Sequence, residues 1–143
     1  MKKGLLLIIL IFTINNLFAS SFTDKKITEF VSYLKKGEYG QGIENLLKES
    51  SLEEKVLNVT QTKNNWINQF TQIQSVYGDY LNHEKVKSIK LGRMVKTYYF
   101  VYCEIYPIQI IITEYDNGDV IDLINMEFDD QVLTTLDIFG IVE

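Results

Sequence analysis

The sequence predicts an α+β fold in which two or three helices pack on a curved antiparallel sheet of about four strands. Two observations predict this class. Hydrophobic residues recur with the period of a helix in the first half of the chain, and from Val76 onward the period changes to that of a strand. The pair Asn117-Gly118 then separates two strand-like runs, as expected for a tight antiparallel hairpin. Helices that come first and strands that follow are typical of the α+β class.

Residues 1–19 have the three parts of a secretory signal peptide: a pair of lysines, an apolar run, and the small residue Ala19 before the cleavage site. The mature chain would then begin at Ser20. The apolar run is roughly ten residues long, whereas a helix needs about 20 to span a bilayer, so the pattern favours cleavage over a retained anchor. No cysteine follows the run to carry a lipid. We therefore expect an exported protein, periplasmic or secreted, without a membrane span after cleavage.

The composition predicts one acidic domain over residues 20–143. Removing the 19 signal residues from 143 leaves 124, which is enough chain for one ordinary core. Loss of Lys2 and Lys3 leaves 12 of the 14 basic side chains against 19 acidic ones, a net side-chain charge of −7. This charge repels polyphosphates, and no basic stripe interrupts it, so the composition argues against nucleic acid as a partner.

The cysteine and histidine counts argue against an internal disulfide and a structural metal, and we expect no cofactor. Cys103 is the only cysteine, and its apolar surroundings in the sequence predict an inert buried thiol. One cysteine and one histidine cannot make a structural zinc site. Asp116, Asp119 and Asp122 cluster around Gly118, but neither the glycine nor a closing glutamate falls at the position that a calcium loop requires. We expect these aspartates to be hairpin and solvent-face residues.

The first two helices are predicted from short apolar stripes. The first stripe falls at helical spacing and is followed by Gly37, a residue that commonly ends helices; its members are Ile27, Phe30, Val31 and Leu34. A second, shorter helix is predicted from Gly42 to Ser50, with a buried edge formed by Ile43, Leu46 and Leu47.

The longest helix is predicted to run from Ser51 to about Gln74 and to lie across the sheet. It opens on a capping box, in which Ser51 supplies the hydroxyl and Glu54 the carboxylate. The apolar positions that recur along it at helical spacing are Leu52, Val56, Val59, Trp66, Phe70 and Ile73.

The strands follow in the order of a meander. A polar strand from Tyr80 to Leu91 precedes a central strand from Arg93 to Ile105, both faces of which are rich in apolar and aromatic residues. Pro107 opens the third strand, where it needs no ladder hydrogen bond, and Val120 to Phe128 is the returning strand. The returning strand changes its parity, which indicates a bulge near Ile124-Asn125. The apolar tail that follows, from Val132 to Val142, must cover part of the domain or a partner subunit.

This order of elements resembles the NTF2-like, cystatin-like α+β superfamily, and more particularly its small uncharacterised exported members from bacteria. The resemblance extends from about Thr23 to Asp130. The residues that carry it enter the sheet, open its third strand and form its last hairpin; they are Val76, Tyr77, Gly78, Asp79, Tyr80, Pro107, Tyr115, Gly118 and Phe128. The resemblance implies a cone in which helices close over a concave sheet, a pocket at the open end, and dimerisation through the outer sheet face.

By this resemblance, four aromatic side chains are candidates to line the pocket: Trp66, Phe70, Tyr77 and Tyr99. The alternative is that they simply fill the core. Tyr98, Phe100 and Tyr102 alternate with the inward residues of the central strand, so we expect their face to meet a partner subunit or the C-terminal tail. Ordinary sheet propensity explains these three residues as well.

The sequence offers only weak catalytic candidates. Enzymes of the superfamily place an Asp or Glu, often with His or Tyr, inside an apolar pocket, where burial tunes the pKa of the carboxyl group. Asp79 and His83 are the candidates, although turn formation explains the first and an exposed strand position the second. No serine lies in a nucleophile elbow, and Cys103 has no neighbouring histidine, so nucleophilic catalysis has no support.

The function that the sequence favours is that of an exported, non-enzymatic binding domain. It would bind a small ligand in the cone pocket or a protein partner on the sheet face, and it would form a homodimer through that face. An isomerase-like or dehydratase-like enzyme that uses Asp79 or His83 is the alternative. A structural component of an envelope complex, with a filled pocket, is the third hypothesis.

Overall fold

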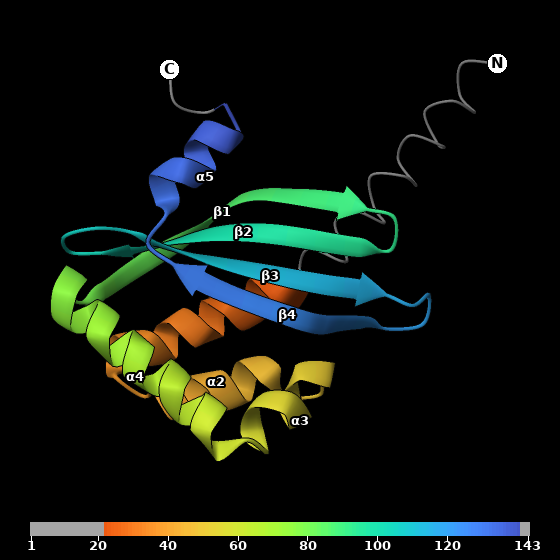
Figure 1. Ribbon diagram of the computed structural model, residues 1–143, viewed down its shortest axis with the longest axis horizontal. Helices are drawn as coiled ribbons and strands as arrows, with labels where there is room; N and C mark the ends of the chain where they lie inside the picture. The colour runs from red at the N-terminus through yellow and green to blue at the C-terminus, as the bar shows by residue number, and fades with distance from the viewer. Residues whose placement is uncertain (1–21, 141–143) are drawn as a thin grey trace.

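The computed structural model describes residues 22–140, and in it the helices precede a four-stranded antiparallel sheet (Figure 1). The predicted α+β class is therefore confirmed. A helix over residues 22–36 comes first, and the elements after it are α2 (Tyr39–Leu47), α3 (Ser51–Leu57), α4 (Thr60–Tyr77), β1 (Tyr80–Leu91), β2 (Met94–Cys103), β3 (Ile108–Asp116), β4 (Ile121–Asp129) and α5 (Val132–Ile138). The predicted signal peptide and its cleavage site at Ala19 and Ser20 lie outside the described residues.

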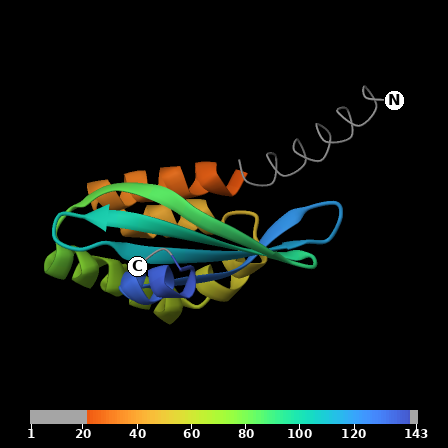
Figure 2. The ribbon, with the colours of Figure 1, turned by 90° about the horizontal axis from the view of Figure 1, so that it is seen from above.

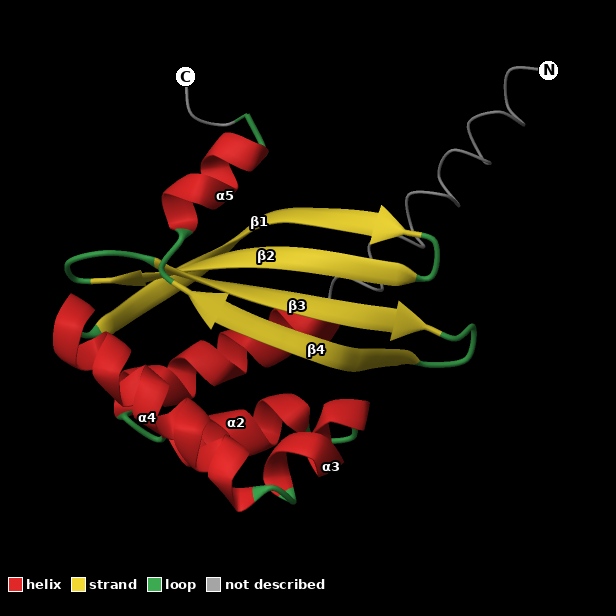
Figure 3. Ribbon diagram, viewed as in Figure 1, coloured by secondary structure: helices red, strands yellow, loops and turns green. Residues whose placement is uncertain are grey.

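The helices before the sheet lie on one of its faces, and α5 lies on the other (Figures 1 and 3). Figure 2, seen from above, has α5 on the near side. We call the face under the first four helices the inner face and the face under α5 the outer face. Among the described residues, no helix is long and apolar enough to cross a membrane.

The two N-terminal helices bury the stripes that the sequence predicts. All four stripe residues of helix 22–36 are buried, and Gly37 ends the helix with a φ of +73°. Helix α2 begins earlier than predicted, at Tyr39. Gly42 lies within this helix, at the place where it crosses helix 22–36 closely. A Cβ atom at Gly42 would lie 2.8 Å from the Cβ of Tyr33. Glycine therefore allows the two helices to approach each other closely.

The prediction of one long helix from Ser51 to Gln74 was wrong. The helix breaks at Asn58 and Val59, where α3 ends and α4 begins. Asparagine and the β-branched residues Val59 and Thr60 disfavour a continuous helix, because they lose side-chain freedom in it or compete for backbone hydrogen bonds. The hydrophobic spacing continued across the break, so periodicity alone could not reveal it. Val59, which the pattern placed in the apolar stripe, is exposed.

The predicted capping box at Ser51 is also replaced by a long-range contact. Asp122 of β4 accepts hydrogen bonds from the Ser51 backbone N–H, at 2.8 Å, and from the Ser51 hydroxyl. The carboxylate thus satisfies a donor at the first turn of α3, a position that favours negative charge. Asp122 therefore caps α3 from a half-exposed position on β4, a role that its prediction as a solvent-face residue did not include.

The sheet is a meander in the order β1-β2-β3-β4, and every neighbouring pair is antiparallel. The pairing of β3 with β4 shifts between Thr113 and Glu114, which oppose Asn125 and Leu123. Ile124 is therefore the extra residue of a bulge, as predicted. Two further irregularities lie in β1, between Tyr80 and Asn82 and between Lys85 and Lys87. Bulges increase the local twist of a strand, so both edge strands of this sheet bend.

The core lies between the inner face and the helices. Phe30 and Phe70 pack from the helices with their rings edge to face, 5.4 Å apart. The sheet contributes alternate residues of β2 and β3, which are Tyr99, Val101, Cys103, Ile108, Ile110 and Ile112. Each fully buried side chain of this size contributes about 1.5–3 kcal/mol of transfer free energy. The interior between helices and sheet is thus filled by side chains.

The apolar tail forms α5, which covers part of the outer face. Val132 and Thr135 are buried, and the ring of Phe139 lies edge-on to Tyr98, 4.8 Å away. Lys87 lies over the same Phe139 ring at 4.6 Å. Phe139 thus covers Tyr98 of the predicted interface face, and the expected partner subunit stays a prediction. Ile141 and Val142 lie outside the described residues.

Candidate functional site

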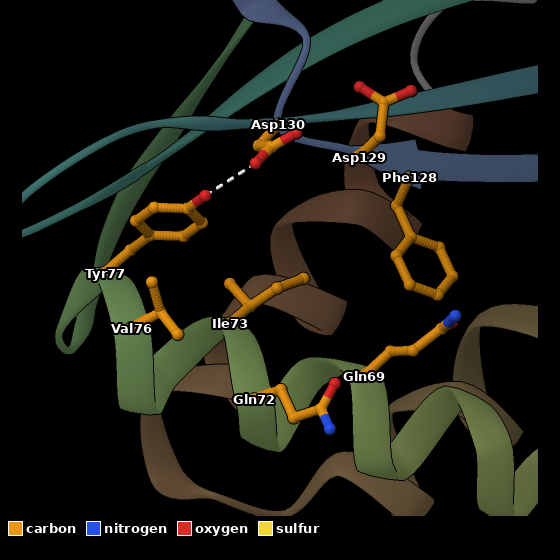
Figure 4. Close-up of a pocket in the computed structure, with 8 residues that line it drawn as sticks. All are labelled: Gln69, Gln72, Ile73, Val76, Tyr77, Phe128, Asp129 and Asp130. Atoms are coloured by element: carbon orange, nitrogen blue, oxygen red, sulfur yellow. Dashed lines mark hydrogen bonds between the residues drawn. The ribbon is translucent and has the colours of Figure 1, made fainter.

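A pocket of about 260 Å³ lies between the second half of α4 and the end of β4 (Figure 4). We call it the α4–β4 pocket. Helix α4 supplies one wall, and the end of β4 with the residue after it supplies the other. The residues that line it are Gln69, Gln72, Ile73, Val76, Tyr77, Phe128, Asp129 and Asp130.

Phe128 connects this pocket to the core. Its ring stacks on Phe70 with a centroid distance of 4.4 Å and meets Trp66 edge-on at 5.6 Å. Such aromatic pairs fix the orientation of a ring beyond what burial alone does. The apolar floor of the pocket is therefore held by the interior of the protein.

Tyr77 and Asp130 join the two walls. The Tyr77 hydroxyl donates a hydrogen bond of 2.6 Å to Asp130, and the two side chains face each other across the pocket (Figure 4). This hydrogen bond raises the pKa of Tyr77, with smaller contributions from burial and from the negative charge of Asp130. The phenol is thus a protonated donor at neutral pH, and it fixes the position of the carboxylate.

The Asp129 side chain points to the outer face, away from the Phe128 ring (Figure 4), where the sheet and the start of α5 hold it. One of its carboxylate oxygens accepts a hydrogen bond of 2.7 Å from the side-chain amide of Gln109 and one of 2.8 Å from the backbone N–H of Gln131. Gln109 is buried, and its carbonyl oxygen in turn accepts from the Thr135 hydroxyl of α5. The position of Asp129 at the edge of the pocket therefore depends on the position of α5.

Of the four predicted pocket residues, Tyr77 lines the α4–β4 pocket. Phe70 and Tyr99 are fully buried in the core, and Trp66 packs on the core from its edge. The Tyr99 hydroxyl donates a hydrogen bond of 2.6 Å to Asp24 of the first helix. Three of the four side chains thus serve packing in this structure, which is the alternative that the sequence left open.

Asp79 and His83 do not line the pocket. Asp79 is exposed at the turn between α4 and β1, where it accepts a hydrogen bond of 2.7 Å from Gln74. His83 is half-buried on β1, and one of its ring nitrogens lies 3.2 Å from the Thr28 hydroxyl. Burial lowers the pKa of His83, and the charge of Asp24 partly offsets that effect. The structure does not bring the two candidates together with the pocket.

Among the interface candidates, Tyr98 contacts Phe139 and Phe100 is buried on the outer face. The Tyr102 hydroxyl donates to Glu84 on the neighbouring strand, and this hydrogen bond raises the pKa of Tyr102 to about 12. All three lie on the outer face. In the register of β2 and β3, Tyr98 pairs with Ile111 and Phe100 pairs with Gln109, and neither partner belongs to the inward-facing isoleucines of β3.

Sequence reasoning missed a buried polar cluster on the inner face. Glu114 of β3 is buried, and it accepts a hydrogen bond from Thr23 of the first helix. Burial raises the pKa of Glu114; the Thr23 hydrogen bond and the charge of Lys85 oppose that shift, and Asp24 adds to it. A signal existed, since Glu114 continues the alternation of the inward residues Ile108, Ile110 and Ile112. The described residues contain no group of three side chains suited to hold a metal ion.

Sequence reasoning also missed most of the pocket. The sequence placed Asp129 and Asp130 between the last strand and the tail, and it identified Val76 only as the point where the period changes. These residues are neighbours only because the end of β4 lies beside α4 in the folded protein, and no local sequence pattern carries that information. No family model, curated protein or solved structure matches the chain. The resemblance to the NTF2-like superfamily therefore stays a prediction.

Proposed function

We propose that this protein is an exported, non-enzymatic binding domain of the NTF2-like type, and that the α4–β4 pocket is its ligand-binding site. One observation carries the proposal: the pocket joins an apolar wall to polar groups held in fixed positions. The pocket combines the apolar side chains of Ile73, Val76 and Phe128 with polar groups, and ligand sites commonly join apolar surface to a few placed polar groups. The signal-like sequence of residues 1–19 supports export to the periplasm or the medium.

The chemistry of the pocket supports binding rather than catalysis. Acid–base catalysis needs a group that exchanges a proton near neutral pH within reach of the substrate. Tyr77 is a poor base, because its hydrogen bond to Asp130 raises the pKa of the phenol. The enzyme alternative depends on Asp79 and His83, and neither lines the pocket.

The packed interior places the ligand at the edge of the domain. In the cone that the resemblance implies, a ligand would lie between the helices and the sheet. Here that space holds Phe30, Phe70 and Tyr99, each of them fully buried. The same packing supports a structural role in an envelope complex, but that hypothesis leaves the α4–β4 pocket without a use.

Nuclear magnetic resonance tests the proposal directly. The protein, produced from the full-length sequence and labelled with ¹⁵N, is titrated with a library of small compounds and short peptides. We expect saturable shifts at the backbone amides of Ile73, Val76, Tyr77 and Phe128, and each bound compound should be recovered chemically unchanged. Conversion of a compound, or shifts centred on His83 and Asp79, would support the enzyme alternative instead.

A matched pair of variants makes the test specific. Val76 is 60% exposed at the pocket, so Val76→Trp should fill the pocket and abolish the shifts. Val59 is exposed at the opposite end of α4, so Val59→Trp makes the same chemical change away from the pocket and should preserve them. Equal loss in both variants would contradict the proposed site.

A further inference from the structure

We propose that the α4–β4 pocket holds the side chain of a lysine or arginine from an extended partner polypeptide. This inference rests on the binding function proposed above and names the class of ligand. The apolar wall of the pocket, the Asp130 carboxylate at its rim and the exposed amides on α4 each support it.

The apolar wall suits a long aliphatic stem. Ile73 and Val76 line the α4 side, and the Phe128 ring lies opposite them (Figure 4). Lysine and arginine bury such stems along apolar surface while their charged heads stay near water. A volume of about 260 Å³ accommodates one side chain of this size.

The rim offers negative charge that the protein itself does not neutralise. Asp130 accepts its hydrogen bond from the neutral Tyr77 hydroxyl, and Asp129 accepts from two neutral amides. In residues 22–140, the ion pairs of the structure join other carboxylates to lysines and leave these two out. The Asp130 carboxylate at the rim attracts a cation by charge, and the Tyr77 and Phe128 rings that line the pocket add a cation–π interaction.

Other classes of ligand fit this rim less well. An anion would meet the Asp130 carboxylate on a chain whose net charge is −5. A neutral apolar ligand would remove water from this carboxylate without replacing its hydrogen bonds. A metal ion needs more ligands than Asp129 and Asp130 supply, and the described part of the chain has no cluster of three. A cation with an apolar stem satisfies both the wall and the rim.

The amides beside the pocket favour a polypeptide over a free amine. Gln69 and Gln72 lie one turn apart on α4, and both are exposed at the pocket. A side-chain amide offers a donor and an acceptor, the same pair that a peptide backbone presents. A bound polypeptide therefore uses these two glutamines, whereas a simple alkylamine leaves them without a partner.

The test compares three probes on the ¹⁵N-labelled protein at low salt. They are a capped Gly-Lys-Gly tripeptide, the same tripeptide with neutral norleucine in place of lysine, and n-butylamine. We expect the lysine tripeptide to bind about tenfold more tightly than the norleucine tripeptide, and its affinity to fall as salt is added. The amides of Val76, Tyr77, Asp129 and Asp130 should report binding.

Charge variants locate the interaction. Asp130→Asn keeps an acceptor for Tyr77 but removes the charge, and it should weaken lysine-tripeptide binding by about fivefold. Asp119→Asn removes the same charge from the β3–β4 hairpin and should leave binding unchanged. Circular dichroism and the melting temperature verify that both variants are folded.

The outcomes separate this inference from the proposed function. Equal binding of the lysine and norleucine tripeptides, or equal effects of Asp130→Asn and Asp119→Asn, would overturn the cationic ligand while the pocket remained a binding site. Butylamine that binds as tightly as the lysine tripeptide would overturn the polypeptide. Failure of every compound in the library to occupy the pocket would overturn the proposed function itself.

Discussion

At the scale of single residues, Glu114 is a carboxyl group held in the interior. Its side chain is only 7% exposed, and its hydrogen-bond donor, Thr23, lies 91 residues away in the sequence. Burial penalises the charged form and is the main reason why the pKa of Glu114 is raised from its ordinary value of 4.5. The folded state therefore binds this proton more readily than the unfolded state does.

The raised pKa predicts how stability depends on pH. Glu114 contributes stability that is fully present below pH 4.5 and is lost as the pH rises through the folded-state pKa. Glu114→Gln keeps the shape of the protonated acid and an acceptor for Thr23. We expect this variant to unfold at a higher urea concentration than the wild type at pH 7, and the difference to disappear toward pH 4.

Urea unfolding between pH 4 and 8 measures this effect. Glu38→Gln changes an exposed carboxyl group and serves as the control, with no such pH dependence expected. The same pH profile for the wild type and Glu114→Gln would show that the buried carboxyl group does not titrate differently on folding.

Single residues were predictable where the sequence context was local. The apolar neighbours of Cys103 predicted a buried thiol, and the thiol is buried, with its pKa raised by burial to about 11. Glu114 was missed because its partner, Thr23, comes from the opposite end of the sequence. The alternation of β3 indicated an inward glutamate, but nothing near it in the sequence indicated the hydroxyl that meets it.

At the scale of elements, the junction between α4 and β1 depends on Gly78. Its φ of 83° and ψ of −170° belong to a region that only glycine adopts readily. The side chain of Glu104 fills the space beside it, so that a Cβ atom would lie 2.5 Å from a Glu104 carboxylate oxygen. Glu104 also accepts a hydrogen bond of 3.1 Å from the backbone N–H of Asp79. Backbone conformation and a close contact thus both require glycine here.

We expect Gly78→Ala to lower the free energy of unfolding by about 1–3 kcal/mol from backbone strain, with a further loss from the contact with Glu104. In a Glu104→Gly background, which also removes the Glu104 Cβ atom that would lie 2.8 Å away, the Gly78→Ala substitution should lose only the strain component. Gly92→Ala provides the comparison, since its φ is +62° and a Cβ atom there would meet no neighbour within 4 Å.

Chemical unfolding of the four variants and the wild type gives these energies. Equal effects of Gly78→Ala with and without Glu104 would show that the side-chain contact contributes nothing to the requirement.

Elements were predictable where propensity and pattern agreed. The first helix and its end at Gly37, the meander order and the bulge at Ile124 all follow from local spacing and turn chemistry. The break between α3 and α4 was missed because the hydrophobic period continues across Asn58 and Val59. The cap of α3 was missed because its carboxylate, Asp122, comes from β4 and not from the helix itself.

At the scale of the whole molecule, α5 leaves part of the outer face uncovered. Leu91, Met94 and Tyr115 oppose one another in the register of β1, β2 and β3, so they form one row across the sheet. Their exposed fractions are 64%, 44% and 37%. A contiguous exposed apolar row of this kind is typical of an interaction surface.

This row is where we expect the homodimer that the sequence suggested. Met94→Glu places a charge in the centre of the row and should convert a dimer to a monomer in sedimentation velocity. Ile105→Glu changes an exposed apolar residue outside the row and should leave the dimer intact. A wild-type protein that sediments as a monomer at high concentration would contradict the prediction.

For the whole molecule, the sequence predicted the fold class but not where a cavity lies. The sequence determines which residues face inward, and that is sufficient for an α+β domain with its helices on one face. Whether the interior is hollow or filled depends on how rings such as Phe70 and Tyr99 fit against one another. Such packing is a property of three-dimensional fit and has no periodic signal.

The contacts of α5 connect the part of the outer face that it covers with the rim of the α4–β4 pocket. Gln109 of β3 hydrogen-bonds Thr135 of α5 and Asp129 at the pocket rim, and Phe139 after α5 covers Tyr98 on the outer face. A partner that displaces α5 from the outer face therefore also releases the pocket rim. Binding at the two surfaces is then thermodynamically linked, and linkage is reciprocal: a ligand in the pocket changes the affinity of the outer face by the same factor. The short C-terminal helix would thus make a domain with two separate surfaces respond as one.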